Sequence, residues 1–224
     1  MPDEKPKLRF FYFDAKGTGE PLRLLMHHAQ LPFEDVRLDR DLFTKKKSGA
    51  FSHLEVPSLV VDGTNVLISA TAIARYIGRT SGLYPDDPLQ GAAVDALIEQ
   101  AEDMAMGLTV LEEKADRGFD CLGEPENEES AHAVIIKTIN DYILPRHLAN
   151  FESRIAKARG EWIAHTAEPT IADFIIVSRL EWVTTLKGIN KNVLKKYPCI
   201  DAYIKRFYQI PSVIAYYAQP GRRK

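Results

Sequence analysis

The sequence predicts a small α/β domain followed by an all-helical domain. Over residues 1–83, short runs rich in aromatic and branched apolar residues alternate with helical segments, which is typical of a mixed sheet with helices. Over residues 90–224, apolar residues recur almost throughout at helical spacing. The proline- and aspartate-bearing stretch Leu83–Pro88 separates the two patterns, and we place the linker there.

Composition narrows the classes of protein to which the chain can belong. Of its 224 residues, 45% are hydrophobic and 27% are charged, which is ordinary for a globular protein. A formal net charge of −2 gives no electrostatic footprint for nucleic acid or for an anionic membrane surface. Cys121 and Cys199 are too few for a disulfide framework, and residues 1–6 lack the apolar core of a secretion signal. We therefore expect a cytoplasmic protein with no nucleic-acid partner and no membrane partner.

The first predicted elements are a strand, a helix and a second strand. Residues 8–13 are aromatic-rich and read as a strand buried on both faces. A glycine-bearing loop over residues 16–19 follows. Glu20 and Pro21 suit the first turn of a helix, since proline loses no needed N–H there and a carboxylate meets the positive end of the dipole. Residues 36–38 then alternate as the second strand.

A hairpin and a further helix complete the first domain. Residues 56–61 predict a strand entered through a proline, residues 62–65 supply a turn, and residues 66–68 predict the returning strand. Ser69 is suited to cap a helix that should end near Gly82. Strand, helix, strand, hairpin and helix in this order form the thioredoxin-like pattern.

The second domain shows helical periods and their boundary signals. A buried stripe marks one long helix: Val94, Leu97, Ile98, Ala101, Ala105 and Leu108. A second long helix should be kinked or divided by Pro145. The run Thr170–Asp173 matches a capping box ahead of an apolar helix. Shorter helices should follow over residues 190–217, one of them beginning at Pro198.

Five motifs in order resemble the cytosolic glutathione transferase family. Their ranges are Tyr12–Arg23, Val56–Gly63, Ala72–Ile77, Val94–Asp103 and Glu161–Asp173. The resemblance is nearest to the sigma class, with its glutathione-dependent prostaglandin D synthases and S-crystallins. It covers nearly the whole chain, and it implies a thioredoxin-like N-terminal domain that binds glutathione and an all-α C-terminal domain.

The resemblance implies an enzyme that conjugates the glutathione thiolate to small hydrophobic electrophiles. Glutathione would be the co-substrate, and no metal would be required. Tyr12 would be the catalytic residue, donating a hydrogen bond that stabilises the thiolate. From the strand context alone, simple core packing is the more common role for such a tyrosine, and it is the resemblance that favours catalysis. A non-catalytic structural or binding relative, or a glutathione-dependent isomerase, remains the alternative function.

The resemblance also implies which residues hold glutathione. Val56 would offer its backbone to the cysteinyl part, beside a cis bond to Pro57, in the manner of strand addition. The γ-glutamyl carboxylate would lie at the N-terminus of the helix near residue 70. The full set is Phe13, Lys47, Glu55, Val56, Pro57, Ser69, Ala70 and Asp103. Packing for Phe13, a solvated face for Lys47 and plain helix capping for Ser69 remain alternatives.

Two residues depart from the family pattern. Counting back from Ile73, Ala70 stands where the family carries a serine, so a hydroxyl for the carboxylate is lost unless Ser69 supplies it. Thr18 stands where sigma enzymes carry an arginine close to the catalytic tyrosine. The loss of that cation predicts weaker thiolate activation.

The resemblance further implies a homodimer and an electrophile pocket. Asp103 would reach the partner subunit's site, although ordinary surface acidity explains it as well. The pocket would be lined by Met104, Met106, Leu108 and Val110, although methionines at this spacing more often fill a core. Val110 stands about where the prostaglandin-isomerising relative has an aromatic residue, so the sequence does not support that specialised activity.

Overall fold

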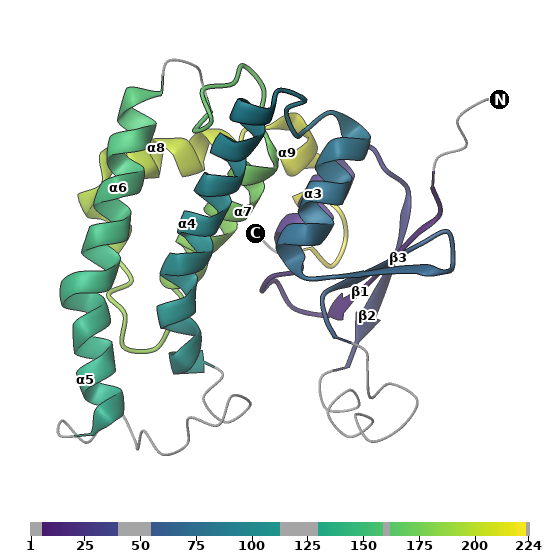
Figure 1. Ribbon diagram of the computed structural model, residues 1–224. Helices are drawn as coiled ribbons and strands as arrows, with labels where there is room; N and C mark the ends of the chain where they lie inside the picture. Colours follow the sequence, from purple (N-terminus) through teal and green to yellow (C-terminus); the bar gives the residue numbers. More distant parts are fainter. Residues whose placement is uncertain (1–5, 40–54, 113–129, 159–161, 223–224) are drawn as a thin grey trace. The chain divides into compact units, whose positions relative to one another are not determined.

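The computed structural model describes residues 6–39, 55–112, 130–158 and 162–222, and its contacts divide the chain into two compact units. The first unit comprises residues 1–88 together with 209–224, and the second comprises residues 89–208. Figure 1 shows the sheet-bearing first unit and the helical second unit. The predicted fold class, a thioredoxin-like N-terminal domain with an all-α C-terminal domain, is confirmed.

The first unit is built on a four-stranded sheet of order β2-β1-β3-β4. Its strands are β1 (Leu8–Phe13), β2 (Phe33–Leu38), β3 (Ser58–Val61) and β4 (Asn65–Ile68). β1 runs parallel to β2 and antiparallel to β3, and β3 is antiparallel to β4. β3 begins two residues later than the sequence pattern suggested, because Pro57 has no N–H to give to a ladder.

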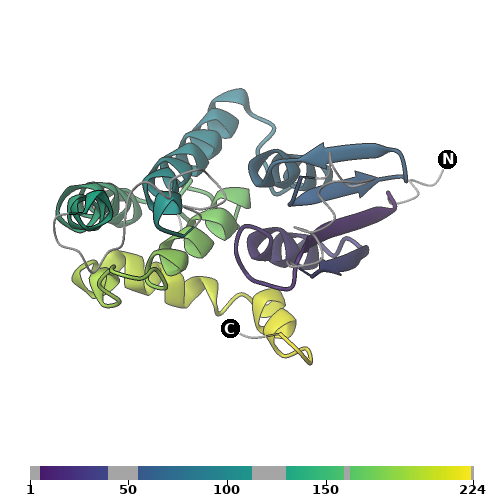
Figure 2. The same cartoon turned by 90° about the horizontal axis from the view of Figure 1, so that it is seen from below.

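Two helices lie side by side on one face of this sheet (Figure 2). They are α1 (Glu20–His28), with proline in its first turn, and α3 (Ala70–Ser81), which ends at Gly82 in the left-handed conformation. Leu8, Phe10 and Tyr12 alternate toward the buried side of β1, which fixes the direction of the Tyr12 ring.

The C-terminal segment belongs to the first unit. Helix α9 (Pro211–Tyr217) packs against α1. Polar contacts join the same partners, because His28 Nδ1 lies 2.7 Å from Ser212 Oγ and the Tyr216 hydroxyl donates to Glu20 at 3.2 Å. The compact unit around the sheet therefore includes residues that the sequence pattern had grouped with the helical domain.

The second unit is helical throughout its described residues. Its elements are α4 (Pro88–Glu112), α5 (Ala131–Thr138), a π-helical turn (Ile139–Ile143), α6 (Leu144–Lys157), α7 (Ile171–Val183), a 3-10 turn (Val193–Lys196) and α8 (Pro198–Phe207). The stripe predicted along α4 is buried. The predicted division of the second long helix takes the form of the π turn just before Pro145, and α8 begins at Pro198 as expected.

The predicted capping box stands at the start of α7, the most deeply buried helix of this unit. Asp173 accepts from the Thr170 N–H at 2.7 Å and from the Thr170 hydroxyl at 3.1 Å. The Tyr203 hydroxyl donates to the same carboxylate at 2.7 Å. Burial raises the pKa of Asp173, and these donors oppose that shift by stabilising the charged form.

Candidate active site

Three candidate residues meet at one end of the sheet. Phe11 pairs with Ser58, and Ser58 pairs with Ile68, so these three form one row across β1, β3 and β4. In the chain, Tyr12 and Ser69 come directly after this row and Pro57 comes directly before it, so the alternating strand directions place all three at the same end of the sheet. The fold therefore brings together the proposed thiolate donor, the proline that follows Val56 and the entry to α3.

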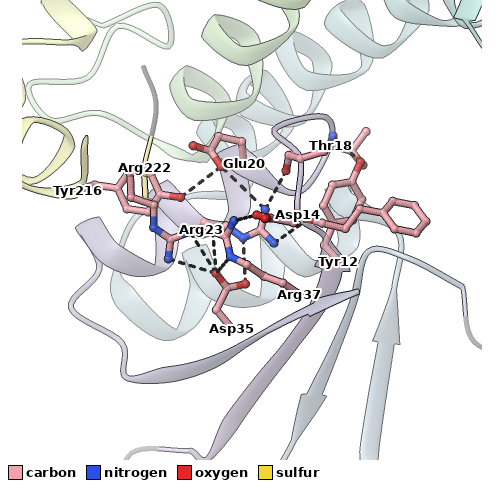
Figure 3. Close-up of polar contacts among 11 residues, drawn as sticks. Tyr12, Asp14, Thr18, Glu20, Arg23, Asp35, Arg37, Tyr216 and Arg222 are labelled. Atoms are coloured by element: carbon pink, nitrogen blue, oxygen red, sulfur yellow. Dashed lines mark hydrogen bonds and ion pairs between the residues drawn. The ribbon is translucent and has the colours of Figure 1, made fainter. Parts of the chain in front are cut away.

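The Tyr12 ring is packed, and its hydroxyl is fixed by the loop after β1. The side chain is 9% exposed, and its ring centroid lies 6.4 Å from that of Phe10 and 5.4 Å from that of Phe13. The Thr18 N–H and the Thr18 hydroxyl each donate to the Tyr12 hydroxyl oxygen at 3.1 Å. The Tyr12 ring is thus packed as a core aromatic would be, whereas its hydroxyl is hydrogen-bonded to Thr18 (Figure 3).

Two glycines allow the loop to approach the ring this closely. A Cβ at Gly17 would lie 2.3 Å from the Tyr12 hydroxyl oxygen, and one at Gly19 would lie 2.2 Å from Tyr12 Cδ1. No side chain fits at either distance, and Gly17 also has a φ of +39°, which side-chain-bearing residues rarely adopt. The Gly-Thr-Gly sequence is therefore what lets Thr18 reach the hydroxyl.

Arg23 holds the same loop through hydrogen bonds to its backbone. Its fully buried guanidinium donates to the carbonyl oxygens of Phe13 at 3.1 Å and Ala15 at 3.0 Å, and to Asp35 at 2.9 Å. It also lies over the Tyr12 ring, 5.6 Å from the centroid. Sequence reasoning quoted Arg23 within a motif and assigned it no role. An arginine in the middle of an apolar helix face was the signal that it had buried partners.

Asp35 gathers three arginines around the base of the site (Figure 3). In addition to Arg23, Arg37 approaches to 3.0 Å and Arg222 to 3.2 Å. Arg37 also pairs with Asp14, in the loop that follows β1. The carboxylate therefore ties the Tyr12 loop, β2 and the C-terminal segment together.

A second buried carboxyl lies beside this group. Burial raises the pKa of Glu20, although the nearby Arg23 charge and the hydrogen bond from Tyr216 oppose that shift. Burial and the Glu20 charge raise the pKa of the Tyr216 phenol, so Tyr216 stays a proton donor to Glu20. This contact fastens α9 to the first turn of α1.

The Val56–Pro57 peptide bond is cis, as the resemblance implied. Pro57 is buried, Val56 is half-buried and Glu55 is exposed. The β1–β3 ladder ends at the pair of Phe11 and Ser58, so the Val56 backbone lies just beyond it. Strand-like addition of a small peptide at this point stays a prediction.

The entry to α3 differs from a simple helix cap. Ser69 adopts φ +72° and ψ 125°, in the region that residues with side chains seldom occupy, and its side chain makes no capping hydrogen bond. Ser69 therefore stands at the N-cap position of α3, as predicted, but does not cap the helix through its side chain. Its hydroxyl instead lies 3.3 Å from the hydroxyl of Thr71, on the first turn of the helix. Thr71 was not predicted from the sequence, although it carries the first hydroxyl after Ala70 and could have been considered for that reason.

The remaining predicted residues lie elsewhere. Lys47 is outside the described residues, and so is the side chain of Val110. In the helical unit, Asp103 is exposed on α4, whereas its neighbour Glu102 forms a double hydrogen bond with Arg179 at 2.7 and 2.9 Å.

The predicted pocket residues on α4 differ in exposure. Met104 and Leu108 are completely buried within the helical unit, as in core packing, whereas Met106 is 66% exposed. A role for these three in an electrophile pocket stays a prediction.

The described residues hold neither a cluster of metal-ligating side chains nor a membrane-spanning helix. Across the described ranges, no group of three or more histidine, cysteine, aspartate or glutamate side chains could hold a metal ion. Among the described helices, none has the length and apolar character needed to cross a membrane.

Comparisons with known proteins agree with this architecture. Residues 121–220 match the family model described as glutathione S-transferase, C-terminal domain. Glutathione S-transferase 1 of Ascaris suum is 30% identical over 96% of this chain and 97% of its own length. The solved glutathione S-transferase from Ascaris lumbricoides is 30% identical, covers 98% of each chain and gives a TM-score of 0.72.

A further solved structure supports the fold alone. Prostaglandin synthase D of Nilaparvata lugens gives a TM-score of 0.78 at 24% identity, covering 96% of this chain and 98% of its own. At that identity the likeness does not carry an activity. The identity and coverage of the Ascaris relatives, together with the order of the motifs, establish that this chain is a transferase belonging to the glutathione S-transferase family.

Proposed function

We propose that this chain conjugates glutathione to small hydrophobic electrophiles and that Tyr12 is its catalytic residue. The observation that carries the proposal is the Tyr12 hydroxyl, held by two donors from Thr18 at the end of the sheet where Pro57 and Ser69 also lie.

The chemistry follows from the acidity of the thiol. A free thiol with a pKa near about 8.5 is mostly protonated at neutral pH, and the thiolate is the nucleophile. A hydrogen bond from the Tyr12 hydroxyl to the sulfur favours the charged form, so the thiol loses its proton to solvent. The thiolate then attacks the electrophilic carbon, a carbon–sulfur bond forms, and a group such as chloride leaves.

Glutathione would be recognised by backbone groups at the same end of the sheet. The Val56 backbone would pair with the cysteinyl part, beside Phe13 and Glu55. The γ-glutamyl carboxylate would meet the first N–H groups of α3, which have no side-chain cap, and the adjacent hydroxyls of Ser69 and Thr71. Thr71 can thus replace the hydroxyl that Ala70 lacks.

Three further assignments rest on the resemblance to the family. Lys47 would reach the glycyl carboxylate. The exposed Asp103 would pair with the glutathione amino group in a partner subunit's site, which requires a homodimer. The electrophile would lie along α4 near the exposed Met106, with Met104, Leu108 and Val110 as the neighbouring positions. We place the reaction in the cytoplasm.

Steady-state conjugation to an activated aryl chloride tests the proposal. Tyr12→Phe keeps the ring and removes the only group that would donate to sulfur, so we expect kcat/KM to fall by about a hundredfold at neutral pH, in the range for loss of one oriented donor. Tyr142→Phe, at a 74% exposed position, is the matched control and should leave the rate unchanged.

The same assay separates the alternative function. A wild-type chain that binds glutathione in calorimetry without turning over any electrophile would instead be a non-catalytic binding relative. The family departures at Thr18 and Ala70 are the observations that favour this alternative. Turnover that Tyr12→Phe leaves intact would remove Tyr12 from the mechanism.

A further inference from the structure

Thr18 contributes two different groups to one oxygen atom. Its backbone N–H and its side-chain hydroxyl both lie 3.1 Å from the Tyr12 hydroxyl oxygen. The side chain is half-buried, in a loop that Gly17 and Gly19 allow to fold against the Tyr12 ring. The backbone contact is open to any residue at position 18, whereas the hydroxyl contact depends on the residue being threonine or serine.

The second contact decides where the Tyr12 hydroxyl proton can point. A phenol oxygen has one proton to donate and two lone pairs that accept. The Thr18 N–H can only donate, so it occupies one lone pair of Tyr12. When the Thr18 hydroxyl donates as well, both lone pairs are occupied and the Tyr12 proton must point away from the loop. A thiolate, as a charged acceptor, competes better for that proton than a neutral hydroxyl does.

Among the described residues, the cations around this loop are engaged elsewhere. Arg23 lies over the Tyr12 ring, but its guanidinium donates to Asp35 and to the carbonyl oxygens of Phe13 and Ala15. The Lys16 ammonium lies over the Tyr217 ring, 5.8 Å from its centroid.

The third cation of this region is also engaged. Arg37 is paired with Asp14 and Asp35. Within the described part of the chain, Lys16, Arg23 and Arg37 therefore each have a partner other than the Tyr12 hydroxyl.

We propose that Thr18 is a positioning residue whose side-chain hydroxyl orients and polarises the Tyr12 hydroxyl, so that a neutral hydrogen bond replaces the missing cation. Donation into a phenol oxygen makes its own O–H a stronger donor, because hydrogen bonds in a chain polarise one another. The inference rests on the proposed function, since it concerns how Tyr12 serves the glutathione sulfur. It also adds to the expectation of weaker thiolate activation at position 18, because the threonine hydroxyl would supply part of what the arginine supplies in sigma enzymes.

Whether the Thr18 hydroxyl donates to Tyr12 or accepts from it decides whether a Thr18→Val variant is slower or faster than wild type. If Thr18 donates, replacing it with valine removes a polarising donor and the thiolate forms less readily. If Thr18 accepted the Tyr12 proton instead, valine would release that proton for the sulfur and the enzyme would become faster. The two directions therefore predict opposite changes in rate.

The experiment is the pH dependence of kcat/KM for the aryl chloride from about pH 5.5 to about pH 9.5, which brackets ordinary thiol ionisation. Thr18→Val, Thr18→Ser and wild type are compared, with Thr64→Val in an exposed turn as the matched control. We expect Thr18→Val to be about fivefold slower at neutral pH, the effect of one neutral hydrogen bond, with its rising limb displaced upward by about 0.7 pH unit. Thr18→Ser should restore the wild-type profile.

The alkaline end of the profile separates activation from structural damage. Where the thiol ionises unaided, the Thr18→Val rate should converge on the wild-type rate. The role of Thr18 would be overturned, with the proposed function left intact, by any of three results for Thr18→Val. These are an equal loss of kcat/KM at every pH, a pH profile identical to that of wild type, or a rate above that of wild type. A wild-type chain with no turnover would overturn the proposed function, and the role of Thr18 with it.

Discussion

Replacing Asp35 by asparagine should destabilise the first unit far more than its position near the surface of β2 suggests. The change keeps the size of the side chain and removes the charge on which Arg23, Arg37 and Arg222 converge (Figure 3). Arg23 is the decisive partner, because its side chain is completely buried and cannot be solvated in place.

The magnitude follows from the burial of that arginine. Removing one partner of a buried ion pair costs about 3–5 kcal/mol. The lower end applies here, since Arg23 keeps two carbonyl oxygens and Glu20 at 3.9 Å, and since the side chains of Arg37 and Arg222 are 30% and 18% exposed. A loss of about 3 kcal/mol corresponds to about 6–12 °C in Tm for a chain of this length.

Calorimetry and urea unfolding measure this loss, with Glu34→Gln as the matched control. Glu34 is the neighbouring residue, and its ion pair with Arg9 is 59% and 51% exposed, so its loss should cost less than about 1 kcal/mol. Because the chain divides into two compact units, any separate transitions are fitted individually. Equal shifts for the two variants, or a shift below about 1 kcal/mol for Asp35→Asn, would refute the reasoning.

Three further changes probe other parts of the structure. Gly19→Ala places a Cβ 2.2 Å from Tyr12 Cδ1, so the ring or loop must move, and we expect kcat for the aryl chloride to fall at least tenfold; an unchanged kcat would contradict this. Thr71→Val should raise KM for glutathione about tenfold with kcat nearly unchanged, because it removes a hydrogen bond to a charged group, and a loss confined to kcat would argue against it. Burial lowers the pKa of His147, although Asp103 opposes this, so protonation below about pH 6.5 favours the unfolded chain and stability falls as pH falls. His147→Gln should flatten that dependence in urea midpoints measured at about pH 5.5 and about pH 7.5, and parallel curves for the two proteins would exclude the histidine as its source.

The order and type of the elements could be predicted because their signals are local. The aromatic run at residues 8–13, proline in the first turn of α1, Gly82 after α3 and the capping box before α7 each act within a few residues. The resemblance to the family added the cis bond before Pro57, which base rates alone would have assigned as trans.

Part of the candidate site could be predicted in the same way, and part could not. Tyr12 followed from its place at the end of a strand within a family motif. The Ser69 backbone conformation and the proximity of its hydroxyl to Thr71 did not, because they depend on how the chain turns from β4 into α3. Glutathione contacts at Lys47, Asp103 and the α4 positions stay predictions.

The sequence by itself determined the two domain types, the order of the strands and helices, and Tyr12 as the candidate thiolate donor. Only the tertiary structure decided that the C-terminal segment joins the first unit, that Asp35 gathers arginines from three parts of the chain, and that Thr18 donates to Tyr12. Periodicity reports which face of an element is buried, but not which distant residue meets it. Hydrogen bonds and buried ion pairs depend on that meeting, since their strength is set by angstrom-scale geometry and by exclusion of water.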